Sequence, residues 1–162
     1  MSQRPINLRS ATQADLDAIN HVIEAAVMTW DLPERVKRLS LPSYRYTVAE
    51  FNHFAMVVAE DHKQTVIGIA AWEPAETKDT PEGQTALLLH GIYVAASHHH
   101  QGIGRQLFQA AEQAARQHHY SGLLVKAQES ASGFFTAQGM KKLPVENHKR
   151  HYANRFWKSV ER

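Results

Sequence analysis

The chain contains no cysteine among its 162 residues. Disulfide bonds and thiolate chemistry are therefore excluded, as is typical of cytoplasmic proteins. No apolar run is long enough to cross a membrane, and no hydrophobic signal segment follows Met1. We therefore expect no export and no membrane partner. The chain also lacks a large excess of charge of one sign, because 18 Lys and Arg residues are nearly balanced by 16 Asp and Glu residues. That balance favours no nucleic-acid partner, although a basic segment between Lys141 and Arg155 keeps that reading open.

Histidine, in contrast, is plentiful, with 11 residues. Three are consecutive, at His98, His99 and His100, and such a cluster suggests a metal site. Consecutive side chains point apart, and no cysteine accompanies them. We therefore expect a solvated loop here and no metal site.

Hydrophobic periodicity divides the chain into alternating elements, and its length suits one domain, residues 1–162. Strands are expected at residues 6–9, 54–60, 65–72, 86–94, 123–127, 140–145 and 155–160, and helices at 12–28, 33–39, 47–53, 103–116 and 131–138. This order predicts an α/β domain with a mixed sheet. Residues 86–94 are nearly all apolar, as in a strand covered on both faces.

The most informative segment is the turn HHHQGIGR (residues 98–105), which joins the apolar strand to an alanine-rich helix. The first N–H groups of a helix lack intrahelical acceptors, and glycine lets a ligand approach the backbone. Such a turn can hold phosphate. No G-x-x-x-x-G-K-[ST] string is present, and Leu107 stands where a dinucleotide-binding fingerprint needs a third glycine. A plain structural turn remains open.

Three segments in the same order resemble the GNAT acetyltransferase family. IYVAASHHHQGIGR (residues 92–105) resembles its motif A, a strand followed by [Q/R]-x-x-G-x-[G/A]. Gly102 and Gly104 match, whereas His99 departs from the usual Gln or Arg. ASGFFTAQGM (residues 131–140) resembles motif B, and LRSATQADL (residues 8–16) resembles the first strand and helix. The resemblance covers residues 6–145.

The resemblance implies an acyl-CoA N-acyltransferase fold, with a mixed, mostly antiparallel central sheet and flanking helices. It also implies acetyl-CoA as cosubstrate, without a metal. The diphosphate would rest on the turn and the pantetheine arm would pair with the strand before it, while further contacts would come from motif B and the end of the fifth strand. The implied residues are Ile92, Tyr93, Val94, His99, His100, Gln101, Gly102, Ile103, Gly104, Arg105, Gln128, Ser130 and Phe134.

Acetyl transfer to a primary amine needs a base, because an ammonium group is not nucleophilic. We expect His90, which takes the place of a glutamate base found in some relatives, within LHGIYV (residues 89–94). An imidazole titrates near neutral pH and suits this role. A buried structural histidine is the alternative. Glu73 is the second candidate base, with a solvated loop residue as its alternative.

The proton donor for the leaving thiolate is not evident. Relatives often use a tyrosine in motif B, whereas this chain has Phe135 there. Ser130, Ser132 and Tyr44 are candidates, and the thiolate can also leave unassisted.

The sequence thus predicts direct acetyl transfer to an amine of a small molecule or peptide, with a non-catalytic acyl-CoA-binding or sensing module as the alternative. The acceptor region, residues 28–51, has mixed charge and selects no substrate. Dimers are common among relatives, so a homodimer remains open.

Overall fold

The structure, a computed structural model, describes residues 6–98, 101–149 and 152–160. Its strands form a seven-stranded sheet in the order β1-β2-β3-β4-β5-β7-β6. The β1–β2, β5–β7 and β6–β7 pairs are antiparallel, whereas β4 and β5 are parallel. The predicted mixed sheet with flanking helices is confirmed. The strands are β1 (Asn7–Ser10), β2 (Ala55–Glu60), β3 (Val66–Pro74), β4 (Ala86–Val94), β5 (Gly122–Lys126), β6 (Lys141–Lys142) and β7 (Arg155–Ser159).

The main helices are α1 (Leu16–Met28), α2 (Glu34–Tyr44), α3 (Val48–His53), α4 (Ile103–Gln117) and α5 (Ser132–Ala137). The chain forms two compact units. Unit 1 extends to Ala71 and takes in Gly91–Leu107, and unit 2 comprises Trp72–His90 and the chain from Phe108 onward. The boundaries fall inside β3 and β4, so the chain changes unit within continuous strands. One domain remains our expectation.

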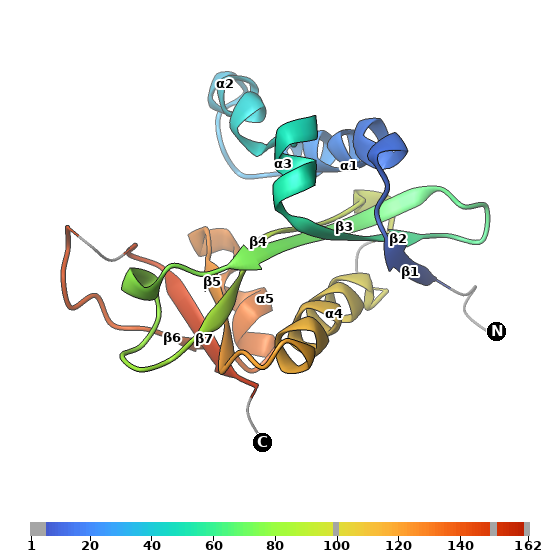
Figure 1. Cartoon of the computed structure of the whole chain (residues 1–162). Helices are drawn as coiled ribbons and strands as arrows, with labels where there is room; N and C mark the ends of the chain where they lie inside the picture. Colours follow the sequence, from blue (N-terminus) through green and yellow to red (C-terminus); the bar gives the residue numbers. More distant parts are fainter. Residues whose placement is uncertain (1–5, 99–100, 150–151, 161–162) are drawn as a thin grey trace. The chain divides into compact units, whose positions relative to one another are not determined.

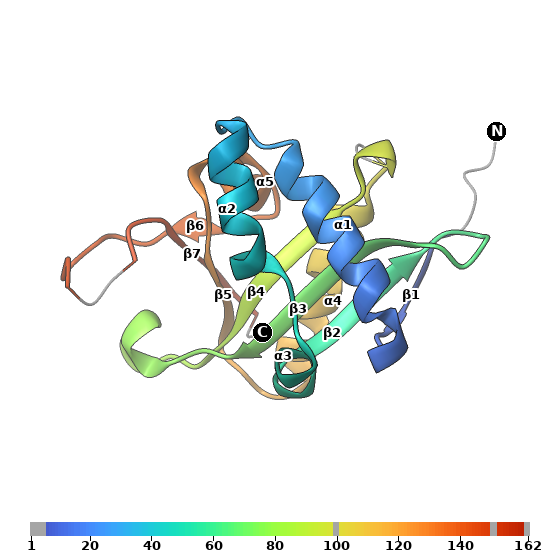
Figure 2. The ribbon, with the colours of Figure 1, turned by 90° about the horizontal axis from the view of Figure 1, so that it is seen from above.

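In unit 1, helix α1 covers one face of β2 and β3 (Figures 1 and 2). Its apolar stripe, including Ile19 and Ile23, packs in one cluster with Val58 and Ile69. The α4 start covers the other face, where an added Cβ at Gly68 would lie 3.0 Å from Leu107 and 3.2 Å from Ile103. A side chain at position 68 would displace that first turn of α4, so glycine there lets the turn seat closely against β3.

In unit 2, the parallel register of β4 and β5 runs from Ala86↔Gly122 to Leu88↔Leu124. The other edge of β5 pairs with β7 over five residues. Against this sheet lies a buried cluster in which Phe108, Phe135 and Phe156 are each at most 4% exposed. Motif B therefore packs against a buried aromatic cluster.

Two elements differ from the predicted lengths. The predicted helix 33–39 extends to Tyr44, although it contains Pro42. Packing outweighs the proline, because Leu41 is buried in the α1 cluster and accepts a hydrogen bond from Arg45 N–H. The predicted strand 140–145 shrinks to two residues. Pro144 has no N–H for a ladder, and its carbonyl accepts a hydrogen bond from the Arg155 side chain.

A network of charged side chains links β1, β2 and the segment before α1 in unit 1. Arg9 in β1 donates two hydrogen bonds to the Asp15 carboxylate, at 2.8 and 3.0 Å, and a third to Glu60 in β2. Asp15 also accepts from the Thr12 N–H at 2.7 Å, as in a capping box. The bonds from Arg9 hold the pKa of the Asp15 carboxyl well below its ordinary value.

Asp15→Asn should therefore lower stability by about 1 kcal/mol at neutral pH, because the amide can still accept from Thr12 but loses the charge that pairs with Arg9. A depressed pKa stabilises the fold above the unfolded-state value of about 4, and this contribution is lost as pH falls below it. Urea unfolding at pH 7 and pH 3 should show a gap between wild type and variant that narrows in acid. Asp17→Asn, at an exposed site in the first turn of α1, is the control. An equal gap at both pH values would contradict this.

Candidate functional site

The glycine turn lies in unit 1, between β4 and α4. The Ala95 N–H donates to the Ile67 carbonyl at 2.8 Å, which ties the end of β4 to β3. His99 and His100 lie outside the described residues. Gln101 and Gly102 are exposed bends, and Gly102 has a φ of +78° with nothing within 4 Å of an added Cβ. A side chain there would be strained but not blocked, so the glycine serves the backbone conformation.

Helix α4 begins directly after this bend. Gln106 N–H donates to the Gly102 carbonyl at 3.1 Å, which makes it the first intrahelical donor. The N–H groups of Ile103, Gly104 and Arg105 therefore precede the hydrogen-bonded part of the helix. Ile103 is 1% exposed and anchors the turn, whereas Arg105 is exposed. Helix geometry gives these three N–H groups no acceptor within α4, and N–H groups at a helix start are the kind of donor that binds anions.

The second half of β4, also in unit 1, holds Ile92, Tyr93 and Val94, all half-buried. Because His90 is exposed and residues 91–94 are only half-buried, the predicted burial of the whole strand on both faces is wrong. Burial raises the pKa of Tyr93 above its ordinary value, and the nearby Tyr44 adds to this. Tyr93 therefore stays protonated at neutral pH and does not act as a base.

Gly91 marks a close approach that the sequence did not reveal. An added Cβ would lie 2.7 Å from the Tyr46 hydroxyl and 2.8 Å from the Tyr93 ring. Tyr46 is 3% exposed, and Asn20 fixes its backbone through two hydrogen bonds of 2.8 Å. The Tyr46 hydroxyl therefore lies directly over β4 in unit 1. The alternation of residues along a strand does not predict this contact, because Tyr46 and Gly91 are 45 residues apart in the sequence.

The two candidate bases lie in unit 2. His90 is exposed on β4, so the reading of a buried structural histidine is wrong. Glu73 is half-buried within β3, and the reading of a solvated loop residue is wrong as well. The strands that carry them are neighbours in the sheet. Both remain candidates for a base.

Motif B forms the helix α5, also in unit 2. Its end is as predicted: Gly139 has a φ of +90° and its N–H donates to the Thr136 carbonyl. Phe134 is half-buried, with its ring centroid 5.2 Å from that of Phe135. Phe135 is 4% exposed and also contacts the rings of Phe108 and Phe156. Position 135 therefore belongs to the aromatic core.

Polar groups gather where β5 ends and α5 begins. Gln128 is half-buried and Ser130 is exposed. Asn154 is 6% exposed, and its Nδ2 donates to the Ala127 carbonyl at 3.0 Å and to the Ser132 hydroxyl at 3.2 Å. Because a carbonyl only accepts, the first bond fixes the orientation of the amide. The Ser132 oxygen therefore accepts, and its own proton remains available for donation.

The acceptor region, residues 28–51, is a helix–loop–helix in unit 1. Lys37, only 6% exposed, donates to the Met28 carbonyl at 2.9 Å and so holds α2 against the end of α1. Trp30 and Tyr44 meet edge to face, with ring centroids 5.1 Å apart. This region is thus built by aromatic packing and one buried cation.

None of the helices in the described part of the chain is both long and apolar enough to span a bilayer. Within the same residues, no three His, Asp or Glu side chains form a group able to hold a metal ion.

Comparisons with known proteins show the family of this chain. A sequence profile of the acetyltransferase (GNAT) family matches residues 24–140. Mouse N-acetyltransferase 8B is 32% identical over 107 residues, which are 64% of this chain. The match spans 43% of the mouse protein, so this chain corresponds to less than half of that relative.

Solved structures share the fold. The paiA N-acetyltransferase of Thermoplasma acidophilum, in complex with coenzyme A, gives a TM-score of 0.74 at 14% identity, covering 96% of this chain and 99% of the other. A GNAT family acetyltransferase from Brucella melitensis, in complex with acetyl-CoA, gives 0.65 at 17% identity, covering 99% and 91%. The chain belongs to the acetyltransferase (GNAT) family. The predicted family is thereby confirmed.

Proposed function

We propose that this protein binds acetyl-CoA and transfers its acetyl group directly to a primary amine of a small molecule or peptide. The absence of cysteine rules out an acetyl-cysteine route. The observation that supports the proposal is the start of α4, where the backbone N–H groups of residues 103–105 follow Gly102. This glycine has a left-handed backbone conformation and open space where a Cβ would lie. Coenzyme A complexes among the structural neighbours support the same cosubstrate.

The residues present suit this cosubstrate. The backbone N–H groups of residues 103–105 would hold the diphosphate, with Gln101 and Arg105 beside it, and His99 and His100 complete the proposed set. The backbone of Ile92 to Val94 would pair with pantetheine amides, in the manner of an added strand. Gln128, Ser130 and Phe134 would flank the acyl end. When bound, acetyl-CoA supplies a thioester that is open to attack by an amine.

His90 takes the proton from the attacking amine in this proposal, with Glu73 as the second candidate. The amine nitrogen forms a bond to the acetyl carbon as the carbon–sulfur bond breaks, and the thiolate takes up a proton. Ser132 is the candidate donor best supported by geometry, because Asn154 occupies its oxygen and leaves its proton free. Phe135 has no proton to give.

Ser132→Ala should lower kcat about tenfold to a hundredfold, at the low end of general acid catalysis because a thiolate is a good leaving group. The dissociation constant for acetyl-CoA should change little. Stopped-flow thiol release and calorimetry measure the two quantities, and Ser132→Thr should restore most of the rate. Ser159→Ala, at an exposed position at the end of β7, is the control, and Ser130→Ala, two residues before Ser132, tests the other serine candidate. A larger loss in Ser130→Ala would transfer the role to that residue.

The proposed function is tested by measuring free coenzyme A release with a panel of amines, after calorimetry with acetyl-CoA. Binding followed by amine-dependent release supports the enzyme. Tight binding without turnover on any amine supports the alternative, a non-catalytic acyl-CoA-binding module, which the missing motif B tyrosine keeps open. If calorimetry detects no heat of binding, both the enzyme and the acyl-CoA-binding module are contradicted. Cytoplasmic location and a homodimer remain expectations.

A further inference from the structure

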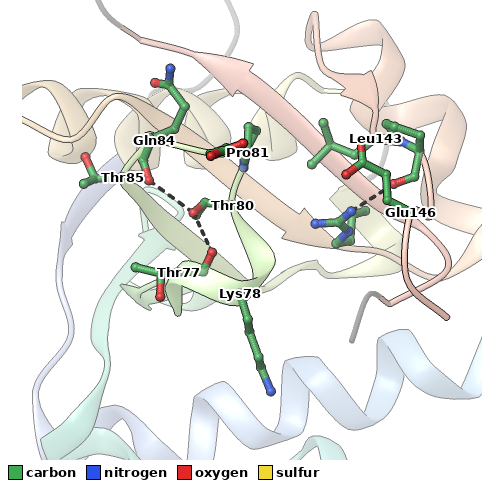
Figure 3. A pocket seen from close by; sticks show the side chains of 12 residues that line it. Thr77, Lys78, Thr80, Pro81, Gln84, Thr85, Leu143 and Glu146 are labelled. Atoms are coloured by element: carbon green, nitrogen blue, oxygen red, sulfur yellow. Dashed lines mark hydrogen bonds between the residues drawn. The ribbon is translucent and has the colours of Figure 1, made fainter. Parts of the chain in front are cut away.

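A cavity lies within unit 2. It measures about 770 Å³ and opens between the β3–β4 connection and the β6–β7 connection (Figure 3). Residues 77–85 except Asp79 line one side, and Leu143, Pro144, Glu146 and Arg155 line the other. None of the candidate bases or cosubstrate residues contributes to its lining. Its volume is that of a small-molecule site.

The walls of the cavity are ordered by their own hydrogen bonds. The Thr80 hydroxyl lies 3.0 Å from the Thr77 carbonyl and 3.1 Å from the Gln84 carbonyl, and both contacts are drawn in Figure 3. Arg155 joins the two connections, because its Nη1 donates to the Asp79 carbonyl and its Nη2 to the Pro144 carbonyl, at 2.6 and 3.0 Å. These hydrogen bonds link the two connections that form the walls of the cavity.

Arg155 is a buried cation without a complete set of acceptors. It is 3% exposed, and its Nε finds no hydrogen-bond partner among the described residues. Its two acceptors are neutral carbonyls. The nearby Asp79 carboxylate, 2% exposed, instead pairs with Lys126 Nζ at 2.9 Å. A buried charge that is compensated only by neutral carbonyls is costly, so the cavity wall favours an anionic group beside this guanidinium. Because Nε is sealed from solvent, such a group would bind the remaining N–H groups of the two Nη atoms.

The remaining charges define the kind of ligand. Lys78 also lines the cavity, but its Nζ pairs with Glu76 at 3.3 Å, whereas Glu82 and Glu146 add two exposed carboxylates. Two carboxylates disfavour a dianion such as phosphate, and they suit an ammonium group. A guanidinium matches the planar fork of a carboxylate. Both signs of charge are thus present in one polar cavity.

We propose that this cavity binds a small zwitterion of the amino-acid class, with its carboxylate on Arg155 and its ammonium group held by Glu82 or Glu146. Neither the acetyl-CoA turn nor the candidate bases enter this proposal, so it does not depend on the proposed function.

Binding is tested on the full chain by thermal shift with the twenty common L-amino acids, followed by calorimetry with each amino acid that raises Tm. Acetate, ethylamine and inorganic phosphate are separate arms. We expect at least one amino acid to bind, and to bind at least tenfold more tightly than acetate or ethylamine. No shift with any amino acid would overturn the proposal, and so would phosphate binding more tightly than every amino acid.

Variants then assign the contacts. Arg155→Met should weaken binding at least tenfold, whereas Arg38→Met, at an exposed arginine in α2, should leave it unchanged. If Arg155→Met does not fold, the double variant Glu82→Gln/Glu146→Gln changes only exposed carboxylates and should weaken amino-acid binding at least tenfold while leaving acetate binding unchanged. Unaltered amino-acid affinity in the folded variants would overturn the site. Calorimetry with acetyl-CoA should give the same affinity in all of them.

Discussion

Gly104→Val is expected to weaken coenzyme A binding at least tenfold, about 1.4 kcal/mol, while the domain stays folded. Gly104 is the second residue of α4, and its backbone N–H is one of the three that precede the first intrahelical donor. A branched side chain there would stand where the diphosphate must approach the backbone. Calorimetry with coenzyme A measures the loss, and thermal unfolding reports stability.

Gln109→Val is the matched control, since it places the same side chain at an exposed position of the same helix. Its affinity for coenzyme A should equal that of the wild type. Equal affinities in Gly104→Val and the wild type would show that no diphosphate rests on this turn, and the proposed cosubstrate site would have to lie elsewhere.

His90→Ala should lower kcat by a factor of about 10² to 10⁴ at neutral pH, the usual contribution of a general base. His90→Gln should behave alike, because an amide does not accept a proton in this pH range. The affinity for acetyl-CoA should stay nearly unchanged in both variants. Since the base acts only when deprotonated, the variants should also lose the acid limb of the wild-type pH profile. Steady-state rates across pH and calorimetry measure these effects.

The control for His90 is His118→Ala, which removes an exposed histidine just after α4. Glu73→Gln, measured beside it, tests the second candidate. A loss confined to Glu73→Gln, with full turnover in His90→Ala, would assign the base to the carboxylate of β3. Unchanged turnover in both would remove both residues from the mechanism.

The elements that sequence patterns predicted well are those governed by near neighbours. The capping boxes at Thr12 and Thr47, the Gly139 helix end and the strand–turn–helix around Gly102 all depend on residues within a few positions of each other. Helix α2 was predicted too short because Pro42 is a local signal, whereas the burial of Leu41 against α1 is not.

The chain by itself determined its family, its strand and helix order, and the glycine turn before α4, since each depends on contiguous residues. Only the tertiary structure decided that His90 is exposed, that Phe135 belongs to the aromatic core and that Arg155 is buried. Arg155 meets the Asp79 carbonyl across 76 positions of sequence, and Phe108 meets Phe135 from another helix. The burial of a side chain and its contacts depend on segments that are distant in sequence. A local sequence pattern therefore does not predict which of these segments will pack against it.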